Sequence, residues 1–474
     1  MATSKELTNK KRTLIFINLI ITCVATGLLQ TALTTALPPI TDDFQISVTM
    51  GQWLTSAYSL VMAVMMPLTA YLITRLPTRR LYITVIAIFL LGTGICIFAP
   101  NFPILMVGRM LQACGNGVVA SMAQVILLSI YPPEKCGSIM GWYGLSAGAA
   151  PVIAPTLAGI LVDLCGWRMI FVCTFAIMLV SFIYAVLVLE DVLETCVKKF
   201  DSFSFLLSAL AFGGITLGVG NIDHGIMAPS ASAPLIVGVV SGCLFVYRQL
   251  HMDQPFLKLR VFKHINFSLS VLSSMLLYLA MMGASILMPL YVQNIMGYSA
   301  TVSGLVTLPG SLAMAIVSPL AGKIYDKMGM RNLAITGSVA LFVGIGGMCF
   351  VTLQTPLIVA VILNIIRNIA IGCLMMPFVT WGVGSIDSKN TADGTALINS
   401  LRTIAGAIGT AVFVEVMNFT ASASADSYGA LADIHGMHVS FAAMSAVAAI
   451  MLVVMVLCVK SAPKKMPERK EKMA

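Results

Sequence analysis

The sequence predicts an all-α integral membrane protein, a bundle of 14 transmembrane helices. Of its 474 residues, 58% are hydrophobic and only 10% are charged, whereas about a quarter of the residues in a soluble chain are charged. The mean hydropathy of +0.95 agrees with this assignment. Apolar runs of about 20 residues, long enough to cross a bilayer as a helix, recur along the whole chain.

Each apolar run is expected to form one transmembrane helix. The predicted helices lie at 13–37, 51–74, 81–99, 103–127, 138–162, 168–189, 202–220, 232–250, 267–293, 300–322, 332–353, 356–382, 395–420 and 439–460. The first run is too long for a cleavable signal peptide and lacks a small-residue cleavage site, so it is counted as a span.

The distribution of Lys and Arg predicts that both termini are cytoplasmic. Alternate loops and the two tails hold nearly all the basic residues, which marks the cytoplasmic side. Arg168 is the only basic residue of the opposite loops, where it lies among several Asp residues. Two ends on one side require an even number of spans, as 14 is. The net charge of +9 is therefore attributed to topology, and no nucleic-acid partner is expected.

Several chemistries lack the motifs they need. The 11 Cys residues are scattered through apolar spans without a Cys-x-x-Cys or Cys/His cluster, so no disulfide framework, metal site or cofactor is expected. The sequence holds no phosphate-binding Gly-x-x-x-x-Gly-Lys loop, which argues against an ATP-driven pump. A polytopic membrane enzyme or a non-transporting sensor is the alternative of another class. No metal-spaced cluster or nucleophile constellation favours an enzyme, and no loop is long enough for a soluble sensor domain.

A faint internal repeat predicts two related halves. PLTAYLITRLPTRR (67–80) and PLAGKIYDKMGMRN (319–332) follow corresponding spans, and Arg109 and Arg367 lie at similar depths in two others. Repeated halves around a central cavity are how many secondary transporters are built. Three parts are therefore predicted: one six-helix half (1–200), an inserted pair of helices with its loop (201–258), and a second half with a basic tail (259–474).

The stretch 137–171 combines a membrane-spanning length with many Gly and Pro residues. In a bilayer, such a helix can bend and approach its neighbours closely, because adjacent spans satisfy freed backbone groups. We expect Pro151, Pro155 and Gly159 to serve conformational change at the seam of the bundle. A tightly packed structural helix is the alternative.

Five segments, in order and spacing, resemble the fourteen-span drug:proton antiporter branch of the major facilitator superfamily. They are GQWLTSAYSL (51–60) with Pro67; GRMLQACGNG (108–117); Pro151, Pro155, Ala158 and Gly159 with WRMIF (167–171); HMDQPFLKLRVFKHINF (251–267); and Asn399, Arg402, Gly406 and Gly409. The resemblance implies two six-helix halves that rock about a central cavity. It also implies proton-coupled export of hydrophobic or cationic drugs. The short loops and the lack of a transit peptide predict a bacterial plasma membrane.

The chain departs from that branch in places that matter for coupling. Leu29 stands where the branch usually has an Asp in its first span, and Thr74 and Pro77 replace the Asp and second Gly of the loop after span 2. Asp326 and Gly329 survive in the second copy of that loop. Export of an endogenous metabolite, lipid or peptide is therefore kept as an alternative within transport.

Ionisable groups inside spans are expensive, so each is a candidate for proton coupling. Glu415 is the only acid well inside a predicted span, and Arg109 and Arg367 are the basic candidates. Asp223, beside His224, is added because it follows a span on the outer side. The alternatives are that Glu415 reaches the interface, that Arg109 bonds backbone carbonyls, and that Asp223 lies in a solvated loop.

A mostly apolar cavity with some polar, aromatic and Met side chains suits lipophilic small molecules. The predicted cavity residues are Gln30, Thr31, Thr34, Gln52, Trp53, Tyr58, Gln112, Asn116, Tyr278, Met281, Met282, Asn364 and Asn399. Ordinary helix packing is the alternative for most of them.

Charged residues at span ends are candidates for gating. Arg75 and Arg79 are expected to pair with helix ends or an acid across the inner seam, with Asp326 and Arg331 as their counterpart. We expect Asp163 and Arg168 to form an outer pair, and Arg402 either to act in gating or to snorkel to the cytoplasmic interface. The expected partners are a lipophilic small molecule, protons and the bilayer.

Overall fold

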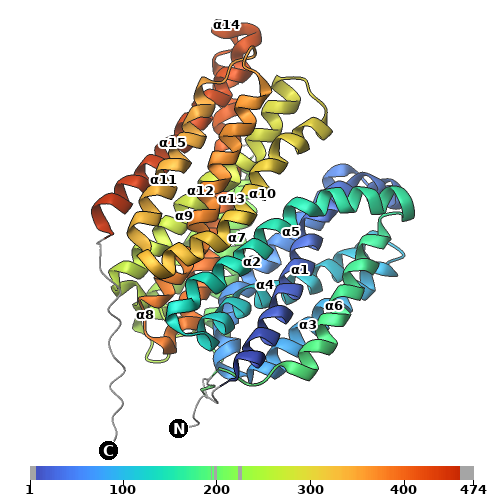
Figure 1. Cartoon of the computed structure of the whole chain (residues 1–474). Helices are drawn as coiled ribbons and strands as arrows, with labels where there is room; N and C mark the ends of the chain where they lie inside the picture. The colour runs from blue at the N-terminus through green and yellow to red at the C-terminus, as the bar shows by residue number, and fades with distance from the viewer. Residues whose placement is uncertain (1–6, 194, 197–199, 223–226, 460–474) are drawn as a thin grey trace, which may run out of the picture.

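The computed structural model describes residues 7–193, 195–196, 200–222 and 227–459. Within these ranges the chain is helical, and no strand is found (Figure 1). Thirteen of the described helices are long and apolar enough to cross a membrane. The prediction of an all-α membrane protein is therefore confirmed. Helix α5 (Cys136–Cys165) is a further long helix, outside those thirteen.

Six long helices form the first bundle. They are α1 (Asn9–Phe44), α2 (Val48–Arg75), α3 (Thr78–Ile97), α4 (Phe102–Ile130), α5 (Cys136–Cys165) and α6 (Arg168–Val188). Local signals begin some of them: the Ser47 side chain accepts a hydrogen bond from the amide of Met50, and Asn101 accepts one from Ile104. Their apolar faces share one buried core.

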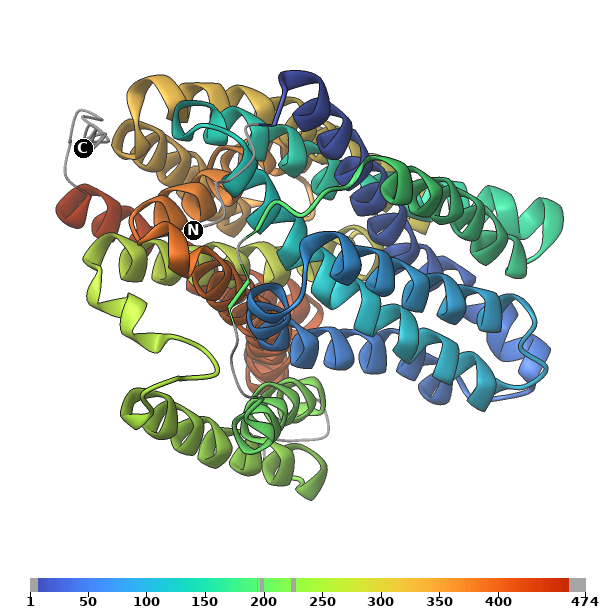
Figure 2. The same ribbon diagram turned by 90° about the horizontal axis from the view of Figure 1, so that it is seen from below.

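Helices α7 (Ser202–Gly220) and α8 (Pro229–His251) form a pair at the edge of the molecule (Figure 2). Glycines allow their backbones to approach closely, since a Cβ on Gly214 would lie 2.6 Å from the carbonyl oxygen of Pro234. Helix α7 contacts both α2 of the first bundle and α13 (Thr391–Ala423) of the second. The pair therefore lies beside the junction of the two bundles.

Six further long helices form the second bundle around a core of their own. They are α9 (Ile265–Leu290), α10 (Ala300–Met328), α11 (Met330–Gly346), α12 (Leu357–Gly384), α13 (Thr391–Ala423) and α15 (Ala432–Cys458), with the short α14 (Ala425–Tyr428) between the last two. Helix α1 begins and α15 ends at the same end of the molecule (Figure 1). We call this end the terminal face and the other the opposite face.

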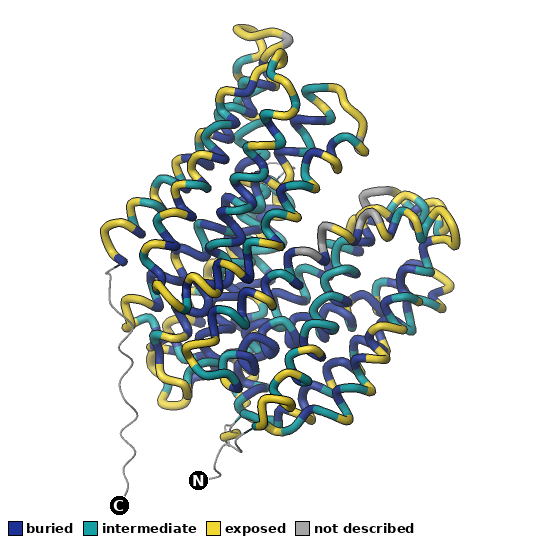
Figure 3. The backbone as a smooth tube through the Cα atoms, viewed as in Figure 1, coloured by how far each residue is buried: buried dark blue, intermediate teal, exposed yellow. Residues whose placement is uncertain are grey.

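The two bundles meet along a seam, which we define as the contacts of α5 with α10 and α12 and of α13 with α2 and α4. Buried residues fill the region where the bundles meet near the terminal face, and the helices diverge toward the opposite face (Figure 3). This arrangement places the functional candidates at the level where the two bundles part.

Candidate functional site

A row of glycines on α5 lets the two bundles touch. Gly137, Gly141, Gly144 and Gly148 are spaced four, three and four residues apart, which places them on one face of the helix. A Cβ on Gly141 would lie 2.5 Å from the carbonyl oxygen of Ser318 on α10, closer than any real contact allows. Gly137 faces the backbone of Gly322 in the same way. Only glycine therefore permits this closeness of α5 and α10.

The same two helices separate toward the opposite face. Gly159 lies 18 residues, or about five turns, after Gly141 on the same face of α5, and its nearest neighbour is Thr35 of its own bundle at 3.9 Å. Gly304 lies about five turns before Gly322 on α10 and has no neighbour within 4 Å. The seam is closed at the terminal face and open at the other.

Asp326 joins the bundles through charge and hydrogen bonds. Its carboxylate, near the end of α10, accepts from the amide of Gly137 at 2.8 Å and from the amide and hydroxyl of Ser138 at 2.7 and 2.6 Å. The first turn of a helix leaves amides without intrahelical partners and carries a partial positive charge. Asp326 of the second bundle thus caps α5 of the first.

Helix α13 closes the seam beside α4 and α2. The Asn399 side-chain amide donates to Ser121 at 3.1 Å and to Gln124 at 3.2 Å, and the Thr403 hydroxyl donates to the sulfur of Met66 at 3.7 Å. Among the described residues, no hydrogen bond joins the bundles farther from the terminal face than the one from Thr403. Asn399, predicted to line a cavity, therefore lies in the closed part of the seam.

Arg109 and three predicted cavity residues form a network inside the first bundle. Arg109 is fully buried, donates to the Leu54 carbonyl at 3.3 Å and to Gln112 at 2.8 Å, and lies 4.2 Å from the centre of the Tyr58 ring. Asn116 donates to the Tyr58 hydroxyl at 2.9 Å. No acid is among these partners of Arg109, so polar groups and the aromatic face stabilise its charge.

Arg367 and Asn364 lie inside the second bundle. Both are buried on α12, and Gly344 of α11 allows the Arg367 backbone to approach closely. The Asn364 amide reaches the carbonyls of Val306 and Thr307 on α10, each at 3.4 Å. Asn364, expected in the cavity, thus joins two helices of one bundle.

Arg402 lies on α13 with its side chain turned toward α9. Its guanidinium lies 4.8 Å from the centre of the Tyr278 ring on α9. Gly406, one turn on, contacts Tyr278 and Met282. The residue is partly buried, and its Nη1 is buried without a hydrogen-bond partner.

Glu415 is partly buried near the far end of α13. It lies 24 residues after Thr391, about 36 Å along an ideal helix and thus farther than the roughly 30 Å of a hydrocarbon core. In the described part of the chain, no hydrogen bond or ion pair of its carboxylate is found. This geometry agrees with the alternative in which the side chain reaches the interface.

The remaining predicted cavity residues lie closer to the surface. Gln52, Trp53 and Thr34 are exposed, the Trp53 side chain by 43%, and the Thr34 hydroxyl donates to the Thr31 carbonyl at 2.7 Å. Gln30 and Met281 are partly buried. The exposed members are not buried by packing within their own bundle.

The predicted outer pair has a different partner. Arg168 donates to the Asp43 carboxylate at 2.9 Å and to the Ala99 carbonyl at 3.3 Å, whereas no ion pair of Asp163 is found among the described residues. The expected Asp163–Arg168 pair is thus corrected to Asp43–Arg168. Because the end of α1 and the start of α6 belong to one bundle, this pair does not span the seam.

The basic loop after α2 also contacts its own bundle. The Arg79 amide donates to Asp191 at 2.9 Å, and its guanidinium donates to the Val186 carbonyl at 2.7 Å. Arg75 is exposed and Arg331 is partly buried. Arg79 therefore pairs with a helix end and an acid, as expected, but not across the seam.

Some predicted residues fall outside the described part. Asp223 and His224 lie there, as do the side chains of Pro151 and Pro155, although both prolines are within α5.

The sequence and fold together match one family of membrane proteins. The profile of the Major Facilitator Superfamily matches residues 19–410. The chain belongs to this superfamily. It is 35% identical over 420 residues to the uncharacterized MFS-type transporter YcnB of Bacillus subtilis, covering 88% of this chain and 89% of YcnB. It is 34% identical over 391 residues to the lincomycin resistance protein LmrB of the same bacterium, covering 82% of each chain.

Other relatives and solved structures agree. The multidrug export protein EmrB of Haemophilus influenzae is 26% identical over 388 residues, covering 80% of this chain and 75% of EmrB. The proton:xylose symporter XylE has the same fold, with a TM-score of 0.67, 13% identity and coverage of 96% of this chain and 97% of XylE. As a member of this superfamily, the chain is a multi-pass membrane transporter rather than an enzyme.

Sequence reasoning missed two features of this major facilitator protein. Ser138 and Gly322 complete the seam, and the signal for them was the matching of small residues on α5 and α10.

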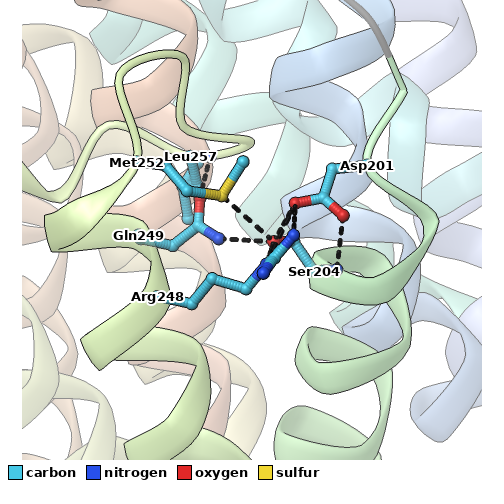
Figure 4. A network of polar contacts seen from close by, with 6 residues as sticks. All are labelled: Asp201, Ser204, Arg248, Gln249, Met252 and Leu257. Atoms are coloured by element: carbon cyan, nitrogen blue, oxygen red, sulfur yellow. Dashed lines mark hydrogen bonds and ion pairs between the residues drawn. The ribbon is translucent and has the colours of Figure 1, made fainter.

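A polar cluster at the terminal face was also missed (Figure 4): Arg248 donates to Asp201 at 3.0 and 3.1 Å, and Ser204 donates to Asp201 at 2.6 Å. Gln249 connects it to the following loop. The cluster fastens α7 to α8.

Proposed function

We propose that this chain is a proton-coupled antiporter that exports lipophilic, drug-like small molecules by alternating access. The observation that carries the proposal is the seam, which is closed at the terminal face and open at the opposite face. Two bundles joined by close glycine contacts, the Asp326 cap and a few hydrogen bonds from α13 can rock against each other. The names of LmrB and EmrB, a lincomycin resistance protein and a multidrug export protein, support export.

The finer assignment within the superfamily is part of the proposal. We place the chain in the fourteen-span drug:proton branch, with α5 as the fourteenth span and both termini in the cytoplasm of a bacterial cell. We also propose the division into 1–200, 201–258 and 259–474, and a core built only from residues after 276 supports the last of these ranges. The present structure is then the outward-facing state.

For coupling, we propose Glu415 as the proton carrier, with Arg109 and Arg367 holding charge within the bundles and Asp223 as a second acid. The support for Glu415 is that it is the one acid of the described helices more than one turn from a helix end. Leu29, where the branch usually has an Asp, is fully buried.

Export of an endogenous metabolite, lipid or peptide is the second candidate. The buried Leu29 favours it, because the chain lacks the first-span acid that would attract a cationic drug.

The test is transport in everted membrane vesicles that carry the full chain. Uptake of a panel of lipophilic dyes should follow an imposed proton gradient and stop when an ionophore collapses it. The Glu415→Gln variant should lose this dependence, whereas Asp163→Asn should keep it. Uptake of no dye, or uptake that is indifferent to the gradient, would contradict the proposal.

A further inference from the structure

We infer that Arg402 binds the anionic group of the transported molecule, so that the preferred substrate is an amphipathic organic anion. This inference rests on the proposed transport function and specifies the chemical class of its substrate. It starts from the position of one guanidinium at the level where the bundles part.

Arg402 lies at the end of the closed part of the seam. It precedes Thr403, whose bond to Met66 is the last one joining α13 to the first bundle, and it follows Asn399, which is bonded to α4. It is 11 residues after Thr391, about 16 Å along the helix and near the middle of a bilayer of about 30 Å. A molecule that enters from the open side and reaches the closed part of the seam would meet this side chain there.

The guanidinium has donors to spare. Its Nη1 is buried without a hydrogen-bond partner, and none of its other nitrogens donates to a described residue. A buried donor left without an acceptor is costly. The planar fork of Arg matches a carboxylate or phosphate through two parallel bonds. An anionic substrate would supply the missing acceptors.

No described acid is positioned to take this role. Glu415 is 13 residues farther along α13, about 20 Å away. Asp393 is nine residues earlier and accepts from the amide of Lys258 at 3.2 Å. A cationic substrate would therefore meet repulsion here without a compensating carboxylate.

The surroundings suit an apolar body attached to the anion. Tyr278 presents its ring to Arg402, Met282 lies beside Gly406 on the same side of α13, and Met66 lies across the seam. Aromatic and flexible Met side chains adapt to ligands of different shape. Arg109 and Arg367 do not compete for the anion, since each is enclosed within its own bundle.

The experiment compares two dyes that share a xanthene ring system and differ in charge. Fluorescein is an anion and rhodamine 123 a cation, and the purified full chain is titrated with each by fluorescence anisotropy. The variants are Arg402→Gln, Arg402→Lys and the matched control Arg80→Gln, which removes an exposed Arg at the terminal face. Competition with phosphatidylglycerol micelles and with naphthalene-2-carboxylate separates a lipid headgroup from a soluble anion.

We expect the wild type to bind fluorescein more tightly than rhodamine 123. Arg402→Gln should weaken fluorescein binding about tenfold or more, because a charge-assisted pair is lost. Arg402→Lys should weaken fluorescein binding less, and Arg80→Gln should leave it unchanged. Displacement of fluorescein by either competitor supports the anion site. The competitor that displaces it shows whether the site takes a lipid headgroup or a soluble anion.

Tighter binding of rhodamine 123 by the wild type would overturn the inference, and this comparison holds even if a variant fails to fold. Fluorescein binding that is unchanged in Arg402→Gln would also overturn it. Export of rhodamine 123 in everted vesicles that survives Arg402→Gln would preserve the proposed export function but not the anion site. Arg402-dependent fluorescein binding without transport of any dye would refute export alone.

Discussion

At the scale of single residues, helix α5 begins without a capping side chain of its own. Its N-cap position is Lys135, which makes no side-chain capping bond, and the role passes to Asp326 of the other bundle. A helix cap supplied across a seam exists only while the seam is closed. It therefore ties a local backbone requirement to the conformation of the whole protein.

Asp326→Asn should weaken the closed terminal face. Removing the charge from the start of α5 costs about 1–2 kcal/mol, which changes a two-state ratio about 5- to 30-fold. Spin labels on the terminal ends of α5 and α10 should report a larger open population. Asp163→Asn, at the far end of α5, is the matched control, and equal populations in both variants would refute the role of Asp326.

The Asp201–Arg248 pair should stabilise the inserted helices in a pH-dependent way. Burial raises the pKa of Asp201, but hydrogen bonds from Ser204 and the charge of Arg248 outweigh it, so the pKa lies below its usual 3.8. A carboxyl group whose pKa is lower in the folded state stabilises the fold at pH values above its unfolded-state pKa. This stabilisation is lost as the pH falls through the folded-state pKa.

Asp201→Asn should accordingly lower the melting temperature at pH 7 more than at pH 3. Thermal unfolding of wild type and variant in detergent measures the difference. An equal decrease in melting temperature at both pH values would show that the charge of Asp201 does not contribute to stability.

At the scale of helices, glycines decide which ends of α5 and α10 touch. Gly141 and Gly159 lie on one face of α5, yet only Gly141 has a backbone atom of the other bundle where a Cβ would stand. Sequence patterns predict that such small residues allow close packing. Which of these glycines is in contact depends on whether that end of the seam is open or closed. The sequence is the same in both conformations and therefore does not distinguish them.

Gly141→Ala should separate the bundles at the terminal face, whereas Gly159→Ala should not. The added methyl group is forced against the Ser318 carbonyl, an overpacking cost of about 1–3 kcal/mol. The gain in helix propensity is shared by both variants. Transport rate and label distances across the terminal seam should change only in Gly141→Ala. A matching change in Gly159→Ala would contradict the assignment of contact.

At the scale of the molecule, composition predicts the membrane fold because a bilayer imposes helices of fixed length on a chain. The partners of individual charges follow from packing and are less predictable. Arg168 pairs with Asp43 instead of the nearby Asp163, because α1 ends beside the start of α6. Arg402 turns toward Tyr278 because α9 lies against that face of α13. Hydropathy predicts neither how a helix is rotated about its own axis nor which helices lie next to it.

Alternating access requires that the two ends of the seam move in opposite directions. The most direct test places one pair of spin labels at Leu164 of α5 and Leu305 of α10, which are both exposed near the opposite face. A second pair is placed at Lys135 and Lys323, near the terminal face. Pulsed electron spin resonance then measures both distances in a cysteine-free variant that still transports, with and without a transported dye and at two pH values.

We predict that the Leu164–Leu305 distance shortens as the Lys135–Lys323 distance lengthens. Two distances that stay fixed, or that change in the same direction, would contradict a transporter that rocks about this seam.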